Sequence, residues 1–132
     1  ALNEMTIYAV NGAGDMFAWD NNDTVWFIEH DTLEKKLFAS NLSEALFRRI
    51  IEFASGEYIF GFCKDGEKDD DLISETEAVD MLKGYVSAFG SCFDENRKEI
   101  LNCLINSGFN EYGELISFEQ SRKIIEDTER YT

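Results

Sequence analysis

The spacing of apolar residues divides the chain into an N-terminal part with strand periodicity and a C-terminal part with helix periodicity. Short runs rich in β-branched and aromatic residues occupy 5–10, 15–20, 24–29 and 35–39, with turn-forming Asn, Asp and Gly residues between them. Connections this short require hairpins, so we expect an antiparallel β-meander. A further strand is predicted at 57–63.

From residue 41 onwards, apolar residues recur every three or four positions, as in amphipathic helices. Asn41 and Glu44 form a capping box that opens a helix over 42–54. We expect this helix to lay one apolar face on the meander, formed by Leu42, Ala45, Leu46, Ile50 and Phe53. Three more helices are predicted from their capping residues, which are Ser74, Asp94 and Ser117. The predicted fold class is α+β: a meander of four to five strands packed by a helix, followed by a C-terminal three-helix segment.

Length and composition favour one domain over residues 1–132, with the helical extension beginning at about residue 65. There is no apolar run of the ~20 residues that a membrane span needs and no signal-peptide pattern. Three cysteines without Cys-x-x-Cys spacing are expected to be reduced, partly buried thiols. These features together predict a cytoplasmic protein.

Charge narrows the range of partners. The chain has 27 acidic and 12 basic residues, a formal net charge of −15, which argues against binding nucleic acid or an anionic membrane. Residues 15–34 carry six acids and no Lys or Arg, and residues 65–80 carry eight acids and one Lys, so these two stretches hold −13 of the −15. Such segments either serve solubility or steer a basic protein partner. The candidate partner contacts chosen from this charge are Asp20, Asp23, Asp69, Asp70 and Asp71.

The sequence predicts no metal or cofactor site. His30 is the single histidine, and a strand through it would turn Glu29 and Asp31 to the opposite face, away from any shared metal. Packing, or hydrogen bonding at the end of a strand, is the expected role of His30. Gly12 and Gly14 precede a strand rather than a helix, so they predict a tight turn and not a phosphate-binding loop.

Three consecutive segments have a familiar order. Residues 11–20 form a Gly-rich turn and a strand ending in Asp, residues 25–31 read Val-Trp-Phe-Ile-Glu-His-Asp, and residues 38–46 make a small-Ser step into a helix. This order, over about residues 7–54, resembles the distal half of the SUKH superfamily domain, and it is also similar to an immunity domain paired with type VI secretion DNase effectors. SUKH proteins include cell-wall regulators and bacterial immunity proteins.

The resemblance implies an α+β domain without catalytic activity that binds a protein. The expected function is that of an immunity protein that binds and occludes a cognate toxin, such as a nuclease with a basic substrate groove. A regulatory adaptor for signalling or cell-wall proteins is the alternative within the family. A small hydrolase or metal enzyme using Asp15, Asp20 and His30 is the alternative from a different class.

Overall fold

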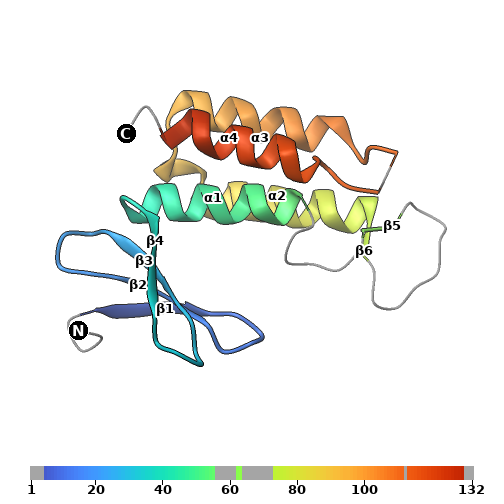
Figure 1. The fold of residues 1–132 in the computed structure, drawn as a ribbon. Coiled ribbons are helices and arrows are strands. Elements are labelled where there is room, and N and C mark those ends of the chain that lie inside the picture. The colour runs from blue at the N-terminus through green and yellow to red at the C-terminus, as the bar shows by residue number, and fades with distance from the viewer. Residues whose placement is uncertain (1–4, 56–61, 64–72, 112, 130–132) are drawn as a thin grey trace. The chain divides into compact units, whose positions relative to one another are not determined.

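The computed structural model describes residues 5–55, 62–63, 73–111 and 113–129 (Figure 1). By its internal contacts the chain divides into two compact units, residues 1–46 and residues 47–132. The division falls inside the first helix, α1 (Leu42–Ala54). The prediction of one domain with an extension from about residue 65 stays a prediction. Each unit is described by itself below.

The N-terminal unit is the predicted antiparallel meander. Its strands pair in the order β1-β2-β3-β4, each with its neighbour in sequence (Figure 1). Their bounds are β1 Thr6–Val10, β2 Met16–Trp19, β3 Val25–Ile28 and β4 Lys35–Ala39. The alternation of apolar residues and the short Asn/Gly/Asp turns therefore predicted both the strands and their pairing.

Strand register fixes which side chains share a face of the sheet. Phe17 pairs with Phe27 and Trp19 with Val25, so these four side chains lie on one face, which we call the inner face. In each edge strand the register shifts by one residue. The extra residue is Tyr8 in β1 and Phe38 in β4. Such a bulge leaves an extra residue without a partner in the ladder.

Both bulge residues add an aromatic ring to the inner face. The ring centroid of Phe17 lies 4.9 Å from that of Phe38, 5.2 Å from that of Phe27 and 6.2 Å from that of Tyr8. These tilted and edge-on contacts are the geometries that aromatic pairs prefer. A buried cluster results, and its fully covered members are Phe17, Val25, Phe38, Ala39 and Ala45.

The helix α1 begins with the predicted cap. The Asn41 side chain accepts a hydrogen bond from the Glu44 amide at 2.9 Å, and the Glu44 carboxylate accepts bonds from the amide and hydroxyl of Ser40. The apolar face was predicted correctly at Ala45, which joins the sheet cluster. It was wrong at Leu42, which is the first residue of the helix and is 37% exposed.

The C-terminal unit contains the three predicted helices: α2 (Glu75–Phe89), α3 (Glu95–Ser107) and α4 (Phe118–Glu129). Each begins at its predicted cap, with Ser74, Asp94 and Ser117 accepting a backbone amide three residues on. A short 3-10 turn, Gly90–Cys92, follows α2. The buried Arg97 joins the helices, since its guanidinium donates to Asp94 and to the Thr128 carbonyl and lies over the Phe47 ring.

Three expectations need correction or fall outside the described residues. Only β5 (Phe62–Cys63) of the predicted strand 57–63 is described, and it pairs in parallel with β6 (Ile73–Ser74), not with the meander. The cysteines were expected to be partly buried, but Cys92 and Cys103 are exposed. The predicted contacts Asp69, Asp70 and Asp71 lie outside the described residues.

The inner-face packing gives a stability prediction. Phe17→Ala should lower the free energy of unfolding by about 3–5 kcal/mol, because the lost ring contacts three others in a filled cluster. Ile7→Ala, in β1 and 49% exposed, should change it by only about 0.5 kcal/mol. Urea unfolding followed by tryptophan fluorescence measures both. Equal losses in the two variants would contradict the assignment of the core to the inner face.

Candidate functional site

The acids of residues 15–34 are all placed in the hairpin loops, and the strands between them carry none. Since successive hairpins turn at alternate ends of a meander, the loops gather the charge at two ends of the sheet. One end holds Asp15, Glu29, Asp31 and Glu34. The opposite end holds Asp20 and Asp23. A stretch that is uniformly acidic in sequence thus becomes two separate acidic ends.

At the first end, Asn11 and Asp15 close the turn between β1 and β2. The Asn11 side-chain oxygen accepts the amides of Ala13 and Asp15, and Gly14 has a φ of +92°, a conformation that glycine adopts without strain. Gly14 also lies close to His30, because a Cβ built at Gly14 would be 3.6 Å from the His30 Cβ. The Gly12-x-Gly14 pattern is therefore the predicted tight turn.

His30 is held between two carboxylates. Its backbone amide donates to Asp15 Oδ1 at 3.0 Å, its Nδ1 lies 2.8 Å from the same oxygen, and its Nε2 lies 2.9 Å from Asp31 Oδ1. Strand-end hydrogen bonding is confirmed. The expectation that Asp31 points away was wrong, because β3 ends at Ile28 and the chain turns before His30, so strand alternation no longer applies.

These contacts shift both pKa values. The His30 backbone amide, and then its ring, hold the pKa of Asp15 at about 2, below the ordinary 3.8. The hydrogen bond that the His30 ring donates to the Asp15 carboxylate, with the negative charges of Asp31 and Glu29 nearby, raises the pKa of His30 above the ordinary 6.5. Asp15 and His30 form an ion pair that links the β1–β2 loop to the β3–β4 loop. We call this pair the clamp.

At the opposite end, Asp20 organises the β2–β3 loop. Its Oδ1 accepts the amides of Asn22 and Thr24 at 2.8 and 3.1 Å, and its Oδ2 accepts the indole N–H of Trp26 at 3.0 Å. The Trp26 bond is the main reason why the pKa of Asp20 is lowered from 3.8. Both carboxylate oxygens are therefore engaged inside the loop, and Asp20 shapes this end of the sheet.

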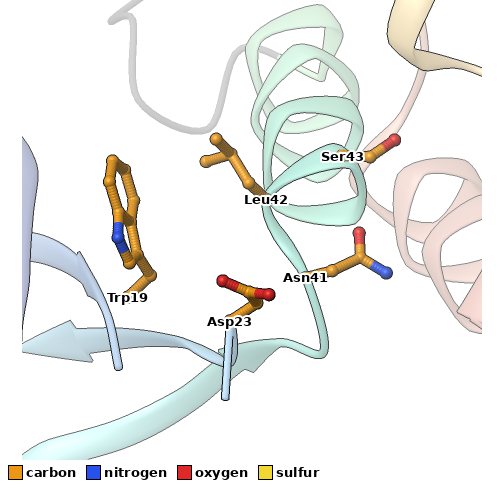
Figure 2. A pocket seen from close by; sticks show the side chains of 5 residues that line it. All are labelled: Trp19, Asp23, Asn41, Leu42 and Ser43. Carbon is orange, nitrogen blue, oxygen red and sulfur yellow. The ribbon is translucent and has the colours of Figure 1, made fainter. Parts of the chain in front are cut away.

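Asp23 is presented differently. It is exposed, has a φ of +65° in the loop that Asp20 holds, and donates its amide to the Asp20 carbonyl. Its side chain lines a hollow of about 540 Å³ with Trp19, Asn41, Leu42 and Ser43. Figure 2 shows Trp19 and Leu42 on opposite sides of this hollow, with the Asp23 carboxylate below them.

The hollow combines an apolar wall with a negative charge. Trp19 supplies an indole face and Leu42 an exposed aliphatic side chain, and Asp23 lies at their base (Figure 2). A Lys or Arg side chain from a partner fits this chemistry, since its aliphatic stem packs on apolar surface and its charge meets a carboxylate and an aromatic ring. Sequence reasoning selected Asp23 from charge but missed Leu42, whose helical spacing suggested burial.

The residues named for a hydrolase do not converge. Asp15 and His30 are in contact, but Asp20 lies beyond the other end of β2, so the four residues of that extended strand place it about 16 Å from Asp15. In the described part of the chain, no three His, Cys, Asp or Glu side chains gather in a way suited to holding a metal ion.

The sequence matches no protein-family model, and comparisons with curated proteins and with solved structures gave no significant match. The described helices include none that is both long and apolar enough to cross a bilayer.

The clamp predicts a bell-shaped pH dependence of stability. The lowered pKa of Asp15 contributes stability that is present above about pH 4 and lost as the pH falls towards 2. The raised pKa of His30 contributes stability that is present below pH 6.5 and lost as the pH rises through the raised value. The clamp therefore stabilises the unit most between about pH 4 and 6.5.

Asp15→Asn tests this window, because it keeps the shape of the side chain and removes its charge. The melting temperature of the variant should fall furthest below that of the wild type near pH 5.5, and the difference should narrow towards pH 2 and pH 9. Asp127→Asn, at an exposed acid of α4, is the matched control and should show a difference that does not vary in this way. A pH-independent deficit in Asp15→Asn would reject the clamp.

Proposed function

We propose that the chain is a non-enzymatic immunity protein that binds and occludes a basic toxin, such as a nuclease, in the cytoplasm. The observation that carries the proposal is the hollow at the second end of the sheet, where Asp23 lies beneath Trp19 and Leu42. The SUKH-like order of residues 7–54 supports the same class of function, because that family includes immunity proteins that bind toxins.

Charge distribution supports a basic partner. Residues 5–46 contain seven acids and two lysines, and six of the acids lie in loops at the sheet ends. Lys36 is already paired with Glu29, its Nζ lying 2.7 Å from the carboxylate. A nuclease binds the phosphates of its substrate through Lys and Arg side chains. The attraction of these side chains to a concentrated acidic surface speeds association and favours the correct partner.

Asp23→Asn tests the hollow directly. Asn tolerates the positive φ of this position, so the substitution removes the charge and leaves the loop unstrained. For an immunity protein, the cognate toxin is expected to be encoded by the adjacent reading frame. The affinity for that protein should fall about two- to tenfold, as for a charge at the rim of an interface. Calorimetry with the two purified proteins measures this, and the melting temperature of the free variant should stay unchanged.

Asp20→Asn is the matched control. It carries the same chemical change in the same loop, but it weakens bonds to Asn22, Thr24 and Trp26, so it should lower the melting temperature. If Asp23→Asn binds the partner as tightly as the wild type does, the hollow is not part of the interface. A stable complex with a signalling or cell-wall protein, and none with the adjacent toxin, would replace immunity by the adaptor function.

Electrostatic steering by the acidic loops also predicts a strong effect of salt on the association with the basic partner. The screening length falls from about 30 Å at 0.01 M to about 8 Å at 0.15 M salt. The association rate constant should therefore fall at least about tenfold over this range, with a smaller change in the dissociation rate constant. Stopped-flow mixing with the adjacent-frame protein measures both. An association rate that is independent of salt would contradict electrostatic steering.

A further inference from the structure

The outer face of the meander carries two apolar rows that cross all four strands. Register places Ile7, Ala18, Trp26 and Leu37 opposite one another in the first row. Val10, Met16, Ile28 and Lys35 form the second row in the same way. Seven of these eight side chains are apolar, although the core cluster lies on the opposite face.

The outer face is exposed at both of its edges, whereas Ala18 and Ile28 in the middle of the two rows are fully buried. Ile7 is 49% and Val10 is 61% exposed on β1, and Leu37 is 64% exposed on β4. Half-buried Met16 and Trp26 lie between these exposed edges, and apolar side chains that share one face in this way mark an interaction surface more often than scattered exposed residues do. Lys35, which lies 4.4 Å above the Trp26 ring, ends the second row.

The acids stand at both sides of these rows. The central strands β2 and β3 run from one acidic loop end to the other, so the order along each of these two strands is acid, apolar, acid. The Asp20 carboxylate accepts the indole N–H of the outer-face residue Trp26, and it thereby ties this face to the loop that presents the exposed Asp23. At the other end, the side chain of Asp31 is 81% exposed.

The geometry points to an amphipathic basic helix of a protein partner, lying across the four strands on this outer face. Four strands span about 14 Å from β1 to β4, and the two rows are about 7 Å apart, which an α-helix of about 10 Å diameter covers. A stripe of apolar residues on that helix contacts the members of the rows that are exposed or half-buried, which are Ile7, Val10, Met16, Trp26 and Leu37. Lys and Arg on either side of the stripe reach the two acidic ends, so charge and apolar pattern match in order.

A second copy of this chain is the poorer occupant of the face. Each copy carries a formal charge of −15, and pairing two outer faces would bring their acidic ends together. The inference rests on the proposed function to the extent that the partner is the same basic protein, because it names the face that receives it.

A synthetic helical peptide tests the face without the natural partner. The probe is a peptide of about 14 residues with a Leu stripe flanked by Lys, and the matched peptide carries Glu in place of Lys. On titration of isotope-labelled protein, amide signals of β1 to β4 should shift with the Lys peptide and stay unchanged with the Glu peptide. Equal binding of both peptides, or shifts confined to the C-terminal unit, would overturn the inference.

Variants locate the contact. Leu37→Ser and Val10→Ser, at opposite edges of the face, should each weaken binding of the Lys peptide about three- to tenfold, because each removes an exposed apolar contact. Phe118→Ser is the control, since Phe118 is 48% exposed on α4 and should not change the affinity. A loss equal to theirs in Phe118→Ser would overturn the inference, as would a dimer of the wild type that Leu37→Ser abolishes in sedimentation.

Two failures remain distinguishable. If the Lys peptide binds as described but the adjacent-frame protein does not bind, the immunity function fails and the docking face stands. If the adjacent-frame protein binds with equal strength to Leu37→Ser and to the wild type, the immunity function stands and the docking face fails.

Discussion

Packing around Phe17 is the contact on which the N-terminal unit depends. A four-stranded sheet with strands of four or five residues has few inward positions, and regular alternation would leave its inner face thinly filled. The bulges in β1 and β4 change this, because each places one additional aromatic ring, Tyr8 or Phe38, against Phe17. Both edge strands thereby contribute large side chains to a core that the central strands alone cannot complete.

The two bulges also determine which side chains lie on the outer face of the sheet. Each bulge restores the alternation after one extra inward residue, so Ile7 and Val10 on β1 and Leu37 on β4 all remain outward. An edge strand with several exposed apolar side chains is costly in solution because it invites aggregation. Acidic loops at both ends of the sheet oppose unspecific self-association, and the same charge favours a basic partner.

Much of the fold followed from the sequence, and the reasons are local. Strands and hairpins were predictable from alternation and turn residues, and the helix starts from the side chains of Asn41, Ser74, Asp94 and Ser117, because both signals lie within a few neighbouring residues. The bulges were not predictable, since an extra inward residue is decided by packing against Phe17 from another strand. The parallel pairing of β5 with β6 depends likewise on a distant segment.

The site was predictable only in part, for the same reason. Charge selected Asp20 and Asp23 together, and nothing in the sequence separates two acids three residues apart. The fold gives them different roles. Both carboxylate oxygens of Asp20 accept hydrogen bonds, from Asn22, Thr24 and Trp26, and these bonds hold the loop in which Asp23 has a positive φ. One carboxylate therefore acts as a structural anchor, so that the other remains exposed beside Trp19. Net charge thus overstates the acids available to a partner, because Asp15 and Asp20 are engaged in holding the loops that present the remainder.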